Sequence, residues 1–539
     1  MKNITAKIII LRNFVEKFKA MQIRKIFFIL LIIYGMLPST LFSQINQGDT
    51  MSFWSVTYVD WPPLAGTPQR RIHATCDRVG THCYVFRENS LSPYLSADLD
   101  TLVHRFDTQF VPKLTSVYGP IPNALDNDTH VFILVIDEPN WCGYFDPAQQ
   151  MTDNFVFSKW ASHSSEHEII YVAGNCFNDA PFICAHEFGH MLHWLQDHSP
   201  EPIVNPTHYW EDAWIDEGFS TFASIYLTEN IFEADVLDDQ AFFATDADIP
   251  LIYFSNYNQV KLWSMFMFEH YGGWNYISAL ISNQLNGIAG MNSSMLQIGL
   301  SENMDDAFLH WSITNYLDDA TFEGGKYAYM HYNFPACAIT ASYTAYPTGV
   351  CNQSVNPYGT DYITFSSSTP TPTAITFDGD SNSKFRLALI KMDLSSNVVN
   401  GVEYIAMDSH NHAVISVDSL GMAYNKAVLV VCNVDSALHE GVKANYSYYT
   451  TNITGIATTD NSQEIKIYPN PTNTILTVSY NSSHEEDTIT IFDVLGNKVY
   501  QSLSSSNRFT IDISTLKKGI YTLESVNSHR TIYEKIIKE

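Results

Sequence analysis

Positive charge is scarce in this sequence. Its 539 residues include 29 Lys and Arg against 57 Asp and Glu, which gives a formal net charge of −28 at pH 7. A surface this acidic repels the phosphates of nucleic acids and the headgroups of anionic membranes. The composition therefore argues against nucleic acid as a partner.

An apolar run long enough to cross a membrane is also lacking. The stretch IFFILLIIYGML, Ile26–Leu37, has 12 residues, whereas a membrane-spanning helix needs about 20. A basic stretch, Met21–Lys25, precedes it, and the small residue Ser43 follows as a candidate cleavage position. The pattern predicts a signal peptide over residues 1–43, with Met21 as a second candidate for its start, and no transmembrane segment in the mature chain. An N-terminal membrane anchor is the alternative.

A C-x-x-C pair is absent, which argues against a cysteine zinc knuckle or a thioredoxin-like redox site. Disulfides are nevertheless allowed in an exported chain. Closeness in sequence suggests the disulfide pairs Cys76–Cys83 and Cys337–Cys351. Cys142–Cys176 is a weaker candidate. We expect Cys184 and Cys432, which lie in apolar segments, to be free and buried.

The remaining chain divides by its pattern of apolar residues. Residues 44–335 mix strand-like and helical spacing, which predicts an α+β unit. Residues 336–455 consist of short alternating runs separated by turn residues, as in a β-sandwich. The polar stretch 456–463 predicts a linker, and alternating runs over residues 464–539 predict a small C-terminal β-sandwich. We therefore expect a multidomain protein.

The stretch HEFGH, residues 186–190, combines two histidines and a glutamate at helical spacing. Positions i and i+4 lie on one side of a helix, so His186 and His190 can bind the same metal ion. Glu187 projects near that side and can accept a proton from a water molecule. The alternative interpretation is five ordinary residues on a buried helix.

A hydrolytic zinc site needs three protein ligands and an open position for water. The histidine that metzincins place ten residues after the first is Gln196 here, which excludes that class. His193 lies almost two turns from His186, so we expect it to pack or to face solvent. Glu217, on the next predicted helix, is the better candidate for the third ligand.

The motifs HEFGH and WIDEG, the latter at Trp214–Gly218, resemble the gluzincin pattern H-E-x-x-H…W-x-x-E-G. Residues 70–330 are similar to hyicolysin-type secreted metallopeptidases. This resemblance implies a zincin-like fold, with zinc bound by His186, His190 and Glu217. One departure is Thr221, because some gluzincins place there an Asp that orients a histidine.

The same resemblance implies a secreted endopeptidase in which Glu187 is the general base and a zinc-activated water is the nucleophile. Its substrates would be extracellular proteins or peptides. A zinc aminopeptidase is one alternative, although the G-x-M-E-N-type motif expected before HExxH is missing. A surface binding protein that uses a peptidase fold as a scaffold is the other.

A peptidase of this kind needs a donor to the oxyanion, and the resemblance points to Tyr257. Tyr226 and His270 are the alternatives. We also expect the strand Glu168–Val172 to line the cleft and pair with an extended substrate as an edge strand.

Three motifs mark the C-terminus: Y-P-N-P at Tyr468–Pro471, D-x-x-G at Asp493–Gly496 and L-x-x-G-x-Y at Leu516–Tyr521. Their order resembles the C-terminal sorting domain of type IX secretion cargo. The resemblance implies the type IX secretion machinery as a partner and a secreted or surface-attached product. The alternative is an accessory β domain that binds carbohydrate or protein.

Overall fold

A six-stranded mixed sheet opens the fold, with strand order β1-β2-β3-β4-β6-β5. Its strands are β1 Thr50–Val56, β2 Gln69–Val79, β3 Cys83–Glu88, β4 Val131–Ile136, β5 Gly143–Phe145 and β6 Ile169–Ala173. Strands β3, β4 and β6 are parallel, and β5 pairs with β6 in the antiparallel sense. Every residue of β4 and β6 is buried, as expected for apolar strands covered on both faces.

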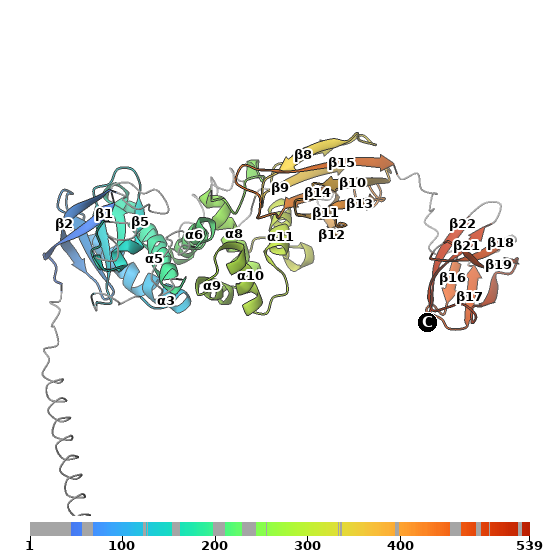
Figure 1. Ribbon diagram of the computed structural model, residues 1–539, viewed down its shortest axis with the longest axis horizontal. Helices are drawn as coiled ribbons and strands as arrows, with labels where there is room; N and C mark the ends of the chain where they lie inside the picture. Colours follow the sequence, from blue (N-terminus) through green and yellow to red (C-terminus); the bar gives the residue numbers. More distant parts are fainter. Residues whose placement is uncertain are drawn as a thin grey trace, which may run out of the picture. The chain divides into compact units, whose positions relative to one another are not determined.

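The computed structural model describes residues 45–56, 68–121, 126, 128–153, 162–197, 211–228, 244–254, 256–331, 334, 337–393, 398–452, 465–480, 487–494, 496–526 and 531–539. The predicted signal peptide and linker lie outside these residues. The described residues up to Asn452 form one compact unit, and those from Ile465 onward form a second (Figure 1).

The prediction that the strand Glu168–Val172 forms a sheet edge is wrong. Strand β6 lies between β4 and β5, so both of its edges are already paired. Strand β5, only three residues long, forms the outer edge instead. Strand order depends on long-range pairing, which the apolar pattern of a single strand does not contain.

Some helices pack against this sheet, and others lie beyond it. The longer ones are α2 Ser96–Arg105, α3 Val111–Tyr118, α5 Ala180–Asp197, α6 Ala213–Thr228, α8 Tyr257–His270, α9 Trp274–Ile281, α10 Gly287–Gln297 and α11 Met304–Leu317. A π-helical turn, Phe106–Phe110, joins α2 to α3. Short 3₁₀ turns lie at Pro147–Gln150, Gly174–Asp179 and Phe322–Gly324. Helices α5 and α6 pack against each other, which brings the two predicted motifs together.

Two antiparallel-rich sheets follow the helices, with orders β13-β10-β15-β8 and β12-β11-β14-β9-β7. Their strands are β7 Ala341–Tyr343, β8 Cys351–Val355, β9 Thr360–Ser366, β10 Thr373–Gly379, β11 Phe385–Asp393, β12 Val398–Ile405, β13 His412–Val417, β14 Lys426–Asn433 and β15 Ala444–Asn452. Figure 1 shows the two sheets as stacked layers, with α11 beside the layer that contains β11.

Strand β11 belongs to two cores at once. Leu387 and Leu389 face the core between the two sheets, whereas Ala388 and Ile390 face the core that the sheet shares with the helices. This alternation follows from the period of two in a strand. The β-sandwich is therefore built into the same compact unit as the helices.

The second unit consists of two small sheets, with orders β16-β17-β20 and β19-β18-β21-β22. Its strands are β16 Ile465–Tyr468, β17 Ile475–Tyr480, β18 Asp487–Asp493, β19 Lys498–Ser504, β20 Arg508–Asp512, β21 Gly519–Val526 and β22 Thr531–Lys538. An aliphatic core that includes Leu476, Val478 and Ile491 fills the space between the sheets. This unit thus has a core of its own.

The cysteines only partly follow the predictions. Cys142 and Cys176 form a disulfide, whereas Cys76, Cys83, Cys337 and Cys351 are free. Cys76 and Cys83 lie on adjacent strands, but Cys76 is opposite Phe86, and the two cysteines face different cores on opposite sides of the sheet.

The second predicted pair fails for a similar reason, because Cys337 belongs to the helical core and Cys351 packs against the sandwich core. Closeness in sequence was thus a poor guide to pairing, since strand register and side-chain direction decide which sulfur atoms meet. Cys184 and Cys432 are free and buried, as predicted.

Candidate metal centre

Two helices build the candidate metal centre. Strand β6 leads through one 3₁₀ turn into α5, which carries His186 and His190 one turn apart. Helix α6 supplies Glu217. A Cβ atom on Gly189 would lie only 3.3 Å from the Cα atom of Ser220, so this glycine permits the close approach of the two helices.

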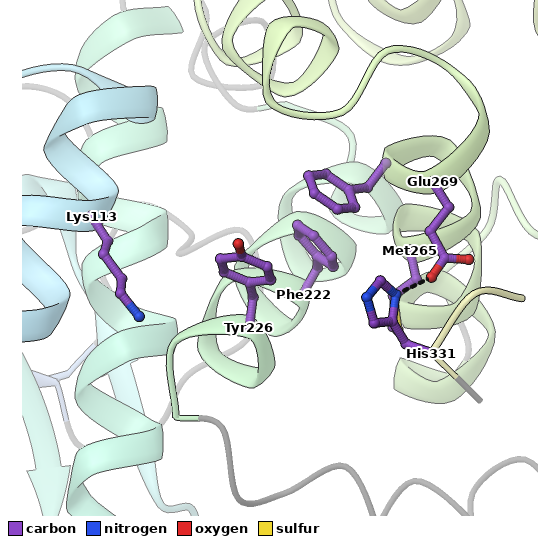
Figure 2. Close-up of a pocket in the computed structure, with 7 residues that line it drawn as sticks. Lys113, Phe222, Tyr226, Met265, Glu269 and His331 are labelled. Atoms are coloured by element: carbon purple, nitrogen blue, oxygen red, sulfur yellow. Dashed lines mark hydrogen bonds and ion pairs between the residues drawn. The ribbon is translucent and has the colours of Figure 1, made fainter.

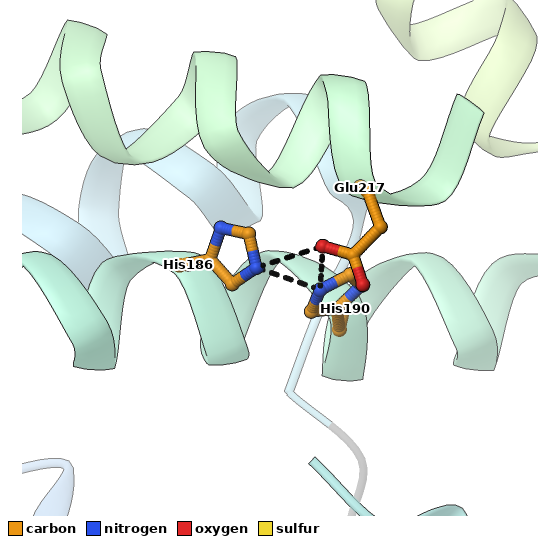
Figure 3. A group of neighbouring side chains, drawn as sticks. All are labelled: His186, His190 and Glu217. Atoms are coloured by element: carbon orange, nitrogen blue, oxygen red, sulfur yellow. Dashed lines mark hydrogen bonds and ion pairs between the residues drawn. The ribbon is translucent and has the colours of Figure 1, made fainter. Parts of the chain in front are cut away.

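The three predicted ligands converge, as Figure 3 shows. The Nε2 atoms of His186 and His190 are 2.9 Å apart. Glu217 Oε2 lies 3.2 Å from His186 Nε2 and 3.5 Å from His190 Nε2. Three ligands at 2.0–2.1 Å from a tetrahedral zinc ion would be separated by about 3.3–3.4 Å. The donor set and its spacing therefore fit zinc.

The charges around the cluster favour a cation. Burial lowers the pKa of His190, but Asp216 and Glu217 outweigh burial and hold this pKa well above its usual value. Burial raises the pKa of Glu217, but the neighbouring histidines outweigh it and bring this pKa down to about 2. The raised pKa of His190 reflects stabilisation of its positive charge, and the lowered pKa of Glu217 reflects stabilisation of its negative charge.

Glu187 lies next to this cluster and is almost fully buried, with 6% of its surface exposed. Burial raises the pKa of Glu187, and the charges of His186 and His190 only partly oppose this shift. A Cβ atom on Gly143 would lie 3.1 Å from Glu187 Oε1, so strand β5 passes directly beside the carboxylate.

The outer ring nitrogens of the two histidines face residues of α6. His186 Nδ1 is 3.4 Å from Thr221 Oγ1, and His190 Nδ1 is 2.9 Å from Asp216 Oδ2. His193, which was predicted to pack or to face solvent, is buried, and its Nδ1 atom is 3.1 Å from Asp216 Oδ1. Asp216 was not among the predicted site residues, although its position directly before Glu217 in WIDEG was a usable signal.

Tyr257 lies beside the cluster. It is the first residue of α8, whose N-terminus is capped by the Asn256 side chain. Its ring centroid is 6.3 Å from that of His186. Burial, together with the charges of Glu217 and Glu187 and a hydrogen bond to Glu217, raises the pKa of Tyr257. The phenol therefore stays protonated and can donate a hydrogen bond.

The alternatives to Tyr257 lie elsewhere. Tyr226 lines a separate cavity of about 220 Å³, which Figure 2 shows between Lys113 on one side and Glu269 on the other. His270 is the last residue of α8, and its Nε2 atom is 2.9 Å from the carbonyl oxygen of Ala328. Neither side chain lines the cluster, because Tyr226 is nine positions beyond Glu217 along α6 and His270 is thirteen positions beyond Tyr257 along α8.

Comparison with known families identifies the second unit. Residues 466–539 match the model of the secretion system C-terminal sorting domain. The chain therefore carries a type IX secretion sorting domain, which implies contact with the type IX machinery and delivery to the cell surface or the medium. Within the described ranges, no helix combines the length and apolar character needed to cross a bilayer.

Comparison with curated proteins finds no match. Among solved structures, a protein with an immunoglobulin-like β-sandwich from Bacteroides vulgatus is similar at 25% identity, over 14% of this chain and 84% of that one, with a TM-score of 0.13. The pre-peptidase C-terminal domain of a Bacillus anthracis collagenase is similar at 14% identity, over 22% of this chain and 100% of that one, with a TM-score of 0.16. Scores this low do not define the fold of the whole chain.

Proposed function

We propose that the first unit is a zinc-dependent endopeptidase that hydrolyses peptide bonds of extracellular proteins. The observation that carries this proposal is the convergence of His186, His190 and Glu217 beside the buried carboxylate of Glu187. A buried helix face would not need three metal-ligating side chains directed at one point, since buried polar groups are costly unless they are paired or bind an ion.

His186, His190 and Glu217 would hold the zinc ion, which when bound polarises water and the substrate carbonyl. Glu187 takes a proton from the attacking water and passes it to the leaving nitrogen. Burial raises the pKa of the Glu187 carboxyl. Tyr257 donates a hydrogen bond to the oxygen on which negative charge develops.

Strand β5 is the proposed binding edge for an extended substrate. Its outer edge is the edge of the sheet, and Gly143 lies against Glu187. An extended peptide that pairs with this edge through main-chain hydrogen bonds would pass beside the base. Binding through the main chain suits an endopeptidase, because it needs no free peptide terminus.

The test is to incubate the purified full chain with a mixed peptide library and to measure bound zinc in the same sample. We expect about one zinc per chain, cleavage at internal bonds and loss of cleavage after chelation. Glu217→Ala should lose most of the zinc, because two ligands hold it more weakly than three. Full zinc occupancy in Glu217→Ala would refute the ligand set.

The same experiment separates the alternatives. Cleavage only at the N-terminal residue would indicate an aminopeptidase. Peptide binding without cleavage, by a protein with bound zinc, would indicate a binding protein built on a peptidase scaffold.

A further inference from the structure

The inner and outer nitrogens of His190 have different surroundings. Nε2 faces His186 and Glu217, as expected of a metal-binding atom. Nδ1 lies 2.9 Å from Asp216 Oδ2 and 3.1 Å from Ser220 Oγ. If Nε2 binds a metal, Nδ1 carries the ring proton and can donate it to either of these oxygens. The carboxylate is both the nearer and the stronger acceptor, because it is charged.

Asp216 is itself held from two sides. Its Oδ2 atom faces His190, and its Oδ1 atom is 3.1 Å from His193 Nδ1. Asp216 and His193 are 7% and 2% exposed, so water does not compete strongly for these contacts. His190 and His193 are three residues apart on α5 and therefore lie on the same side of that helix.

Asp216 and Glu217 are neighbours on α6 but contact different nitrogen atoms of the histidines. Successive residues on a helix point about 100° apart. Glu217 therefore reaches the metal-binding nitrogens while Asp216 reaches the outer nitrogen of His190. Some related sites have an orienting Asp at the position of Thr221. Here the Thr221 hydroxyl lies 3.4 Å from His186 Nδ1.

We propose that Asp216 is the positioning residue of this centre, which fixes the ring of His190 for metal binding, and that His193 holds Asp216 in place. The orienting carboxylate thus acts on the second histidine of HEFGH rather than on the first. This inference rests on the proposed zinc site. It assigns His193 a purpose beyond packing, as a donor that fixes one carboxylate oxygen and leaves the other to His190.

The experiment uses four variants of the purified full chain: Asp216→Asn, His193→Leu, His193→Asn and Ser220→Ala. The zinc dissociation constant is measured by competition with a chromophoric chelator, at a temperature at which the metal-free form of every variant is folded. Loss of a group that orients a metal ligand typically weakens metal affinity by about 10–100-fold. We expect a loss in this range for Asp216→Asn, because the amide keeps the shape but not the charge.

The His193 pair isolates the hydrogen bond from packing. Leu fills much of the space without a donor, so His193→Leu should also weaken zinc binding. Asn places an N–H group near the position of His193 Nδ1, so His193→Asn should restore most of the lost affinity. Ser220→Ala should have the smallest effect, since the hydroxyl is the weaker acceptor for His190.

Four outcomes would overturn all or part of the proposal. Asp216→Asn with wild-type zinc affinity would exclude a positioning role and leave the proposed function intact. A larger loss for Ser220→Ala than for Asp216→Asn would assign that role to the hydroxyl. Equal losses for His193→Leu and His193→Asn would reduce His193 to a packing residue. A wild-type chain that binds no zinc would refute the proposed function together with this inference.

Discussion

The two units of this protein differ in the burial of their candidate functional residues. In the first unit, Glu187 and His190 are each only 6% exposed, and their pKa values are shifted by burial and by neighbouring charge. Among the described residues of the second unit, seven large apolar side chains are exposed, namely Tyr468, Ile475, Val494, Val499, Leu503, Ile520 and Tyr533. The proposed chemistry of the first unit requires groups whose reactivity the protein has altered, and burial is one way to alter it. Recognition by a secretion machinery requires accessible surface, and exposed apolar side chains are one kind of surface that partners bind.

Removal of the second unit should produce the largest effect. A chain that ends at Asn461 should fold and retain the cleavage activity, because the first unit has its own cores, but export should be abolished. The measurement compares the amounts of the truncated and full chains in the medium and in the cells of the native host. Normal export of the truncated chain would show that the sorting function lies elsewhere.

The next effect concerns the buried base. Glu187→Gln keeps the size of the side chain but cannot accept a proton, so the cleavage rate should fall by about 10²–10⁴-fold. Zinc content should stay unchanged, since Glu187 is not a proposed ligand. Export should also stay unchanged, since Glu187 belongs to the first unit and not to the sorting domain. The rate is measured on a protein substrate at matched zinc content. A variant that keeps more than about a tenth of the activity, well outside that range, would refute the proposed base.

Tyr257→Phe tests the oxyanion donor. Loss of one such donor typically lowers kcat by about 10²–10³-fold. KM should change little, because Tyr257 donates to the substrate oxygen mainly when charge develops there, and the zinc dissociation constant is measured in parallel because Tyr257 also hydrogen-bonds Glu217. Tyr226→Phe is the matched control, since this side chain lines a separate cavity. Equal effects of the two substitutions would contradict the assignment.

The smallest effect on the folded state is expected at the surface of the second unit. Leu503 is 64% exposed, so Leu503→Ser should change the free energy of unfolding by less than about 0.5 kcal/mol. If exposed apolar side chains contact the secretion machinery, the same substitution should lower export. Lys518→Ser, at another exposed position of this unit, is the control for both measurements. Equal export of the two variants would argue against a role of exposed apolar side chains in recognition by the secretion machinery.

Local patterns carried much of the information about the metal centre. The spacing within HEFGH predicted a helix, and the structure places these residues in α5. Helical spacing placed His186 and His190 on one side, and the structure brings Glu217 to them as predicted. Features that depend on several distant elements were harder to predict. The edge strand was assigned to β6 instead of β5, because sheet order is a long-range property.

Three features could be predicted from local sequence patterns: the helical HEFGH motif, the sorting motifs between Tyr468 and Tyr521, and the alternation that produces the β-sheets. Long-range packing determined which groups meet across elements. It paired Cys142 with Cys176, placed Asp216 between His190 and His193, and put Tyr257 rather than Tyr226 or His270 beside the cluster. The physical reason is that periodicity fixes the direction of a side chain relative to its own helix or strand. The packing of helices and the register of strands fix what that side chain contacts.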